Sequence, residues 1–307
     1  MNYILVIVLF ISALVLFKLG QQLFTAPLEA PTPKEIEYEK SYYYYNGTSF
    51  QYIAEKIKQF PTKSTEEEFK DTSQCQHLSF IIDLLGGKLN GYFIDLAANN
   101  WYHLSNSYPL EKHFGWTGLC IEPLPSYRVE LLSKRSCDVV VNPIFSDSTS
   151  MVKFTDQNVF GGIVASDMDN NNNKEGAATF DLQTVTLDLV LSHVKAPTVI
   201  DYMSLDVEGA ELHVMMGFNF SKYKILIITV ERPKLKLHKL LTRNGYWFLM
   251  PTPTCHFGDM IYIHESLAGF KQTMNKYRTA VKYTDLPVPE FNATFSYVMR
   301  PSWPVRN

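Results

Sequence analysis

The sequence has few cysteines and no long run of basic residues among its 307 positions. Cys75, Cys120, Cys137 and Cys255 show no C-x-x-C spacing, so neither a zinc site nor a thioredoxin-type motif is indicated. With 28 Lys and Arg against 31 Asp and Glu, the formal net charge is −3. Because a nucleic-acid backbone is bound through clustered Lys and Arg, we expect no nucleic-acid partner.

A glycine-rich loop is missing where the pattern suggests one. Residues 91–106 (GYFIDLAANNWYHLSN) contain an apolar run that ends near Asp95 and is followed by small residues, which is typical of a nucleotide-binding crossover. Ala97 and Ala98 occupy the positions where a glycine hinge is expected. A pyrophosphate lies directly on a helix N-terminus and requires glycine for that approach, so a dinucleotide is a poor fit.

The N-terminus carries a long apolar segment. Residues 3–17 (YILVIVLFISALVLF) contain no charge, and with their flanks they approach the roughly 20 residues that cross a bilayer as a helix. We interpret residues 1–24 as a signal-anchor and residues 25–49, rich in Pro, Glu and Tyr, as a stem or linker. A cleaved secretory signal, with Ala26 as a cleavage position, is the alternative.

The side of the membrane is indicated by two opposing signals. Lys18 follows the apolar run and no basic residue precedes it, which favours a cytosolic body. Three Asn-x-Ser/Thr sequons, at Asn46, Asn219 and Asn292, have meaning only in the secretory lumen. We expect a single-pass membrane protein of the secretory pathway, in the endoplasmic reticulum or Golgi, with a lumenal body.

The rest of the chain alternates apolar runs with amphipathic segments. Residues 50–90 are predicted to be a helical extension, on the helical spacing within FQYIAEKIKQF (50–60), residues 91–270 the main domain and residues 271–307 a tail. Strands are expected at residues 92–96, 118–121, 139–145, 199–205, 225–230, 246–250 and 260–263. Strands separated by helices predict an α/β three-layer sandwich whose sheet is mostly parallel, and the helix-free link between the last two runs predicts an antiparallel end. Residues 158–176 are predicted to be a polar loop insertion.

Carboxylates stand where several of these strands end. In an open parallel sheet, ligands bind beyond the carboxyl ends of the strands, near the point where strand order reverses. An acid after the second strand, here Glu122, accepts hydrogen bonds from ribose hydroxyls; its alternative role is a cap for the helix that begins at Pro125. The stretch SLDVEGAE (204–211) adds Asp206 and Glu208 after the fourth strand, and Glu231 follows the fifth.

These stretches, in their order, carry a resemblance. GYFIDLAANN, LSNSYPLEKHFGWTGLCIEP, SYRVELLSKRSC, IDYMSLDVEGAEL and TVERP resemble the FkbM-type family of S-adenosylmethionine-dependent methyltransferases, and more specifically its membrane-anchored or secreted eukaryotic members. The resemblance covers about residues 78–264. It implies a class I methyltransferase fold with a Rossmann-like sheet.

The resemblance also implies roles for particular residues. The loop that contains Asp95, Ala97 and Asn99 holds the amino-acid end of S-adenosylmethionine, and Glu122 binds its ribose. Ser146 and Asp147 lie beside the adenine, and Asp206 and Glu208 face cofactor and acceptor. Since this cofactor has no phosphate, its loop needs no glycine, and Asn99 or Asn100, which tolerate a left-handed backbone, are the expected hinge.

Methyl transfer to a hydroxyl-bearing acceptor is the expected reaction, since FkbM-type members act mostly on hydroxyl groups. The expected catalytic residues are Asp206 and Glu208, on position, ahead of Glu231, His213 and His103. Together with Glu231, the two acids also offer oxygen ligands for Mg²⁺ or Ca²⁺, although we assign no metal site.

Two other functions are compatible with the sequence. An anchored protein with a stem is also typical of lumenal glycosyltransferases, whose Asp-x-Asp signature matches Asp167-Met168-Asp169, but here the motif stands in a polar insertion rather than at the end of an apolar strand. The unusual loop at Ala97 and Ala98 also suits a methyltransferase-like binding or trafficking protein without catalysis.

Overall fold

The computed structural model describes residues 36–59, 68–170, 177–252 and 258–280. Tyr38–Ile57 and Thr65–Asn307 form one compact unit, and a second unit, Met1–Glu37 with Lys58–Ser64, contributes to the described residues only the outer ends of the first two strands. The predicted signal-anchor and most of the predicted tail lie outside the described residues. Within the described ranges, no helix combines the length and the hydrophobicity needed to cross a bilayer.

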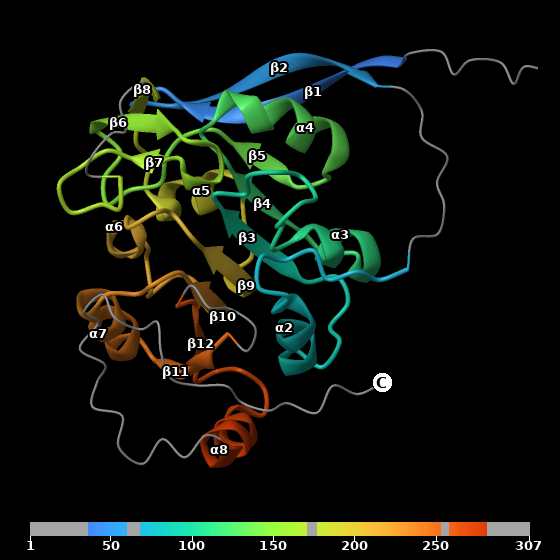
Figure 1. The fold of residues 1–307 in the computed structure, drawn as a ribbon, viewed down its shortest axis with the longest axis vertical. Coiled ribbons are helices and arrows are strands. Elements are labelled where there is room, and N and C mark those ends of the chain that lie inside the picture. The colour runs from blue at the N-terminus through green and yellow to red at the C-terminus, as the bar shows by residue number, and fades with distance from the viewer. Residues whose placement is uncertain (1–35, 60–67, 171–176, 253–257, 281–307) are drawn as a thin grey trace, which may run out of the picture. The chain divides into compact units, whose positions relative to one another are not determined.

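A nine-stranded sheet forms the centre of the main unit, in the order β11-β12-β10-β9-β3-β4-β5-β1-β2 (Figure 1). Neighbouring strands from β10 to β1 run parallel, and β12 and β11 are antiparallel additions at one end. The predicted mixed α/β fold with a mostly parallel sheet and an antiparallel end is therefore confirmed. Apart from β1 and β2, the strands of this sheet are β3 (Tyr92–Leu96), β4 (Thr117–Ile121), β5 (Asp138–Val140), β9 (Val199–Leu205), β10 (Lys224–Val230), β11 (Tyr246–Pro251) and β12 (Met260–His264).

Helices cover both faces of this sheet, because its strands are apolar on both sides. Ile94 and Leu96 of β3 belong to a buried cluster with residues of α5 (Leu187–His193), α6 (Glu211–Met216) and α7 (Leu235–Arg243). Phe93 belongs to the cluster on the opposite face, with residues of α2 (Leu78–Leu84), α3 (Tyr108–Phe114), α4 (Pro125–Lys134) and α8 (Phe270–Ala280). The alternation along β3 decides which of its side chains can reach each face.

The segment before the main domain is a hairpin, not a stem and a helix. β1 (Ile36–Tyr45) and β2 (Phe50–Gln59) extend the sheet beyond β5, with Tyr43 of β1 opposite Val140 of β5. The helix predicted within FQYIAEKIKQF is therefore wrong, and so is the stem over residues 36–45. The apolar spacing misled because Ile57 is the one fully buried residue among residues 50–58 of β2, whose burial is described, and a strand at a sheet edge needs no strict alternation.

Part of the polar insertion has regular secondary structure. β6 (Met151–Asp156), β7 (Gly162–Ile163) and β8 (Ala178–Gln183) form a small antiparallel sheet, and a short 3₁₀ helix, η1 (Asn158–Phe160), precedes β7. A loop throughout residues 158–176 is therefore wrong for its first part. Apolar contacts explain this structure, because Phe154, Ile163 and Met168 pack in a buried cluster with Leu124 and Ala210.

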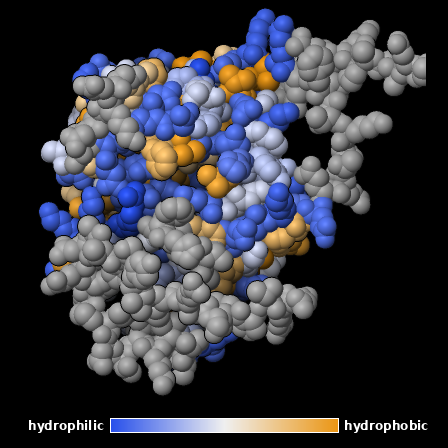
Figure 2. All heavy atoms as spheres, in the orientation of Figure 1, coloured by the Kyte–Doolittle hydropathy of each residue, from blue (hydrophilic) through white to orange (hydrophobic). Residues whose placement is uncertain are grey.

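A disulfide joins Cys120 of β4 to Cys137. Cys120 is completely buried, as its apolar context predicts, yet its sulfur is also cross-linked rather than merely packed. Cys75 is disulfide-bonded as well. The surface seen in Figure 2 is mostly hydrophilic over its described part, with small separate hydrophobic patches.

Candidate active site at the carboxyl edge of the sheet

Strand order reverses between β3 and β9. The chain passes from β3 to β4 and β5 in one direction, and later from β9 to β10 in the other, so the ends of β3 and β9 form the switch point of the sheet. Loops that leave a parallel sheet at such a point diverge and leave room for a ligand. Four of the eight residues predicted to form a site follow these two strands: Ala97 and Asn99 after β3, and Asp206 and Glu208 after β9.

The loop after β3 turns through two left-handed residues. Asn99 has φ 52°, as predicted for the hinge, and Ala97 has φ 58°, which the sequence did not predict because alanine seldom adopts this conformation. The backbone N–H of Ala98 donates to the carbonyl of Ile121 (3.1 Å), and that of Asn99 donates to Oε2 of Glu122 (2.9 Å). The loop is therefore held against the end of β4 without any glycine.

Glu122 is the anchor of this loop. Its side chain is 3% exposed, and its Oε1 accepts the N–H of Leu124 (2.8 Å), just before α4 begins. Burial raises the pKa of this carboxyl to about 7, against the lowering effect of the two backbone hydrogen bonds. Glu122 therefore holds the residue before α4, although α4 itself has no side-chain cap, and each oxygen still has a lone pair for another donor.

A small apolar cavity lies at the carboxyl ends of β3 and β4. Of the predicted site residues Ala97 lines it, and Glu122 lies in the chain between two lining residues, Ile121 and Pro123. The volume of the cavity is about 30 Å³, and its walls come from the ends of β3 and β4, the segment after β5, and the second sheet. The lining residues include Leu96, Ala97, Ile121, Ile144, Phe154 and Ile163. In its present form the cavity admits water but not an aromatic base.

Asp95 lies on the other face of the sheet from this cavity. Its Oδ2 accepts a short hydrogen bond from the hydroxyl of Ser107, which in turn accepts one from Nη2 of Arg135 (2.7 Å). Arg135 also forms an ion pair with Glu111, and its side chain is completely buried. Burial raises the pKa of Asp95 to about 6 despite the nearby guanidinium. The direct cofactor contact predicted for Asp95 remains a prediction.

Ser146 and Asp147 lie in the turn that leads to β6. Asp147 accepts four hydrogen bonds from the backbone and hydroxyl groups of Thr149 and Ser150. Burial raises its pKa, but these hydrogen bonds together outweigh that effect and the pKa is lowered. Neither residue lines the cavity, so their predicted place beside an adenine is untested.

Acidic side chains gather at the ends of β9 and β10. Burial raises the pKa of Asp206 well above its ordinary value, and the neighbouring Glu231, with which it shares a hydrogen bond, raises it further. Burial and Glu231 also raise the pKa of Glu208 to about 7, and burial raises that of Asp259 to about 7. The predicted pair of Asp206 and Glu208 is thus brought together with Glu231.

Arg232 supplies the positive charge at this cluster. Its Nη2 lies 2.8 Å from Asp169, 2.8 Å from Glu231 and 3.4 Å from Glu208. Carboxylate oxygens of these three acids lie within 4.8 Å of one another, so they could hold a metal ion. The three acids considered from the sequence were Asp206, Glu208 and Glu231, so the structure replaces Asp206 with Asp169 in this set. The guanidinium contacts all three acids and already supplies a cation.

The two carboxylates of the Asp-x-Asp motif contact different partners. Asp167 is exposed and contacts Nε2 of His213 (3.2 Å), whereas Asp169 contacts Arg232. The backbone N–H of Asp169 donates to the carbonyl of Glu208 (3.0 Å), which ties the insertion to the acidic cluster. Sequence reasoning missed Asp169 and Arg232 as site residues, although Arg232 directly follows Glu231 in TVERP.

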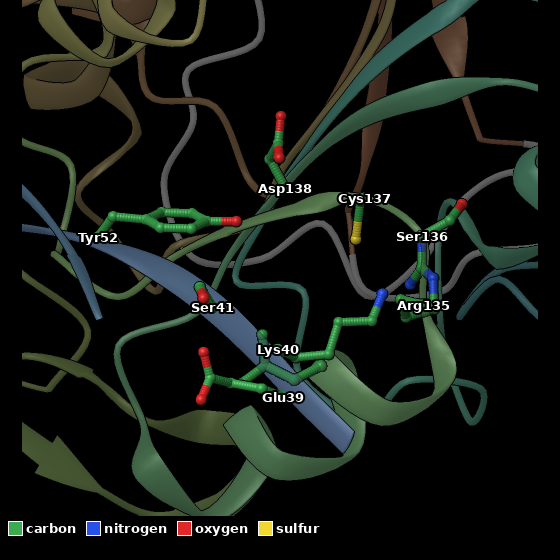
Figure 3. A pocket seen from close by; sticks show the side chains of 9 residues that line it. Glu39, Lys40, Ser41, Tyr52, Arg135, Ser136, Cys137 and Asp138 are labelled. Carbon is green, nitrogen blue, oxygen red and sulfur yellow. The ribbon is translucent and has the colours of Figure 1, made fainter. Parts of the chain in front are cut away.

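A second pocket lies where β5 begins, away from these strand ends. It has a volume of about 160 Å³ and is lined by Lys40 and Tyr52 of the hairpin and by residues 135–138 (Figure 3). It is larger than the cavity at the ends of β3 and β4, but it contains none of the predicted site residues. Ligands of parallel α/β sheets bind at the carboxyl ends of the strands, so the smaller cavity is the better candidate.

Comparison with known proteins gives one match along the sequence. A family model described as "Methyltransferase FkbM domain" matches residues 95–246. No curated protein matches the chain. Among solved structures, precorrin-6y C5,15-methyltransferase from Geobacter metallireducens GS-15 is similar at 14% sequence identity and a TM-score of 0.33, over 64% of this chain and 93% of that one. A likeness that distant supports no conclusion.

Proposed function

Residues 95–246 are an FkbM methyltransferase domain, and from this premise we propose that the protein transfers the methyl group of S-adenosylmethionine to a hydroxyl group of a glycan, lipid or small metabolite. The observation that carries the proposal is the arrangement around Glu122. Glu122 is buried and bound to the loop at Asn99, and its two neighbours in the chain, Ile121 and Pro123, line an apolar cavity at the carboxyl ends of the strands.

The residues beside the cavity suit an adenosine. Glu122 offers acceptors for the two ribose hydroxyls, and the walls formed by Ile121, Ile144 and Phe154 are apolar, as a base requires. The cavity is too small for the base, so we infer that the segment around β7 moves outward when the cofactor binds. The loop at Ala97 and Asn99 is proposed to hold the amino-acid end.

We propose that Asp95 supports this loop from the face of the sheet opposite the cavity. Its network with Ser107 and Arg135 fixes the end of β3, from which the loop departs. Ser146 and Asp147 are proposed to border the adenine through the turn before β6. These roles assign the polar residues of β3 and of the turn to binding, and leave the ends of β9 and β10 to chemistry.

The acids after β9 are proposed to take the proton of the acceptor. When bound, the cofactor supplies an already electrophilic methyl group, so the protein needs to align the acceptor oxygen and remove its proton. Glu208, with a pKa of about 7, is suited to accept that proton near neutral pH. Asp206, paired with Glu231, is proposed to orient the acceptor hydroxyl.

Binding of S-adenosylhomocysteine to the full chain, measured by calorimetry, tests the proposal. We expect binding to weaken by about 10- to 100-fold in Glu122→Gln, since a hydrogen bond to a charged group contributes about 1.5–3 kcal/mol. Asp181→Asn, an exposed substitution on β8, serves as the control and should bind normally. Glu208→Gln should bind the product normally but lose about 10²- to 10⁴-fold in methyl transfer.

A second candidate is a methyltransferase-like binding protein without catalysis, which the small size of the cavity favours. Absence of product binding in a folded protein would support that alternative. For either function we propose a lumenal body in the secretory pathway. The buried bridge between Cys120 and Cys137 supports this location, because disulfides persist in oxidising compartments.

A further inference from the structure

The turn between β1 and β2 holds the first sequon, Asn46-Gly47-Thr48, in a defined local conformation. Oδ1 of Asn46 accepts hydrogen bonds from the N–H of Thr48 (3.0 Å), the hydroxyl of Thr48 (2.8 Å) and the N–H of Ser49 (2.9 Å). The N–H of Asn46 in turn donates to the carbonyl of Ser49 (3.1 Å). All of these bonds join residues within one four-residue segment.

Gly47 makes this turn possible. Its φ is +95°, a conformation that residues with a side chain rarely adopt. A Cβ at this position would also lie 3.0 Å from Oε1 of Gln183. The turn is therefore held by hydrogen bonds within residues 46–49 and by the positive φ of Gly47.

The amide nitrogen of Asn46 is the group that this turn leaves available. Asn46 is exposed, and its Nδ2 makes no hydrogen bond to any residue that the structure describes. One of the three donors to Oδ1 is the hydroxyl of Thr48, which is the residue at the third position of the sequon, where Ser or Thr is required.

The second sequon lacks this arrangement. Oδ1 of Asn219 accepts the N–H groups of Ser221 (3.1 Å) and Lys222 (3.2 Å), but among the described residues it receives no hydroxyl hydrogen bond. The third sequon, at Asn292, lies outside the described residues. The geometry therefore distinguishes Asn46 from Asn219, although both side chains are exposed.

We propose that Asn46 carries an N-linked oligosaccharide and that it is modified in preference to Asn219. In the transfer, Nδ2 of Asn46 forms a bond to the anomeric carbon of a lipid-diphosphate-linked sugar. The bond from that carbon to the diphosphate oxygen breaks, the diphosphate leaves with the electron pair, and Nδ2 loses one proton to a base of the transferring enzyme. The disulfide between Cys120 and Cys137 independently indicates the oxidising compartment in which such donors act.

Endoglycosidase treatment of the full chain, expressed in cells with a eukaryotic secretory pathway, tests this inference. We expect the wild type to gain mobility on treatment, and Asn46→Asp to lack that step. Asp keeps a side-chain oxygen that can accept the hydrogen bonds of the turn but has no amide nitrogen, so the substitution separates modification from folding. Thr48→Ala should lose the same step, and Thr48→Ser, which preserves a hydroxyl, should retain it.

Cleavage by a peptide N-glycosidase in heavy-oxygen water, followed by peptide mass spectrometry, locates the site. Label at residue 46 with less or none at residue 219 is the expected result. Two results would overturn the inference: no mobility step in a folded chain with its disulfides formed, or a step that Asn46→Asp leaves unchanged. Neither result depends on methyl transfer, because the modification is read out without cofactor or acceptor.

Discussion

The bridge between Cys120 and Cys137 should account for a measurable share of stability. The two cysteines are separated by 17 residues, and the cross-link restricts the unfolded chain over that distance. For a loop of this length the chain-entropy relation gives about 3 kcal/mol at 25 °C. The perturbation is the double substitution Cys120→Ala with Cys137→Ala.

Urea unfolding followed by circular dichroism measures the effect, with wild type and double variant each studied with and without reductant. Reductant also opens the disulfide of Cys75, which is common to both proteins. The loss on reduction should therefore be about 3 kcal/mol larger in the wild type than in the double variant. A difference below about 1 kcal/mol would refute the reasoning, because the bridge would then restrict little in the unfolded state.

Three further predictions concern the loop, the buried ion pair and pH. Ala97→Gly should raise the free energy of unfolding by about 0.5–1 kcal/mol, since a left-handed alanine costs about 1–2 kcal/mol and glycine loses about 0.5–1 kcal/mol in chain entropy. Ala98→Gly, at the neighbouring buried position, should lower the free energy of unfolding. A lower stability in both variants would contradict the left-handed conformation of Ala97. Arg135→Leu should lower the free energy of unfolding by about 3–5 kcal/mol, measured by thermal or urea unfolding, because the charge of Glu111 is left buried without its ionic partner. Arg135→Lys should lower it by less. A decrease under about 1 kcal/mol in Arg135→Leu would contradict the importance of the ion pair. Burial raises the pKa of Glu122 from 4.5 to about 7, so the folded state binds this proton more tightly than the unfolded state. The free energy of unfolding should therefore fall as pH rises from about 4.5 to 7. Glu122→Gln should make that fall shallower in urea titrations over a pH series, and an unchanged slope would contradict the assignment.

The sheet could be predicted because its strands are continuous apolar runs separated by helices. Asn99 could be predicted as a hinge because asparagine tolerates a left-handed backbone, and Glu122 because it follows the second run. These features depend on residues within one or two segments. Their signals are therefore present in the local sequence.

The left-handed backbone of Ala97 is a local failure, because alanine seldom adopts it, but several other failures involve partners that are distant in the chain. The segment 50–60 has helical spacing, yet the sheet edge at β5 made it part of a hairpin. Arg135 gave no signal as the partner of Ser107 and Glu111, because nothing in its own surroundings in the sequence marks a buried guanidinium. Asp169 was assigned to a loop, and only the fold brings it to Arg232.

The pairing of β1 with β5 affects the order in which parts of the chain fold during synthesis. The N–H of Tyr45 donates to Oδ1 of Asn142, a contact across 97 residues of sequence, so the hairpin has to wait for that partner during synthesis. At about 5–20 residues per second, the wait is on the order of 5–20 seconds. A β-hairpin turn closes within microseconds, so the turn at Asn46 is complete while its side chain still faces open solvent. The turn can therefore form before this edge of the sheet is complete, and Asn46 stays exposed once it is.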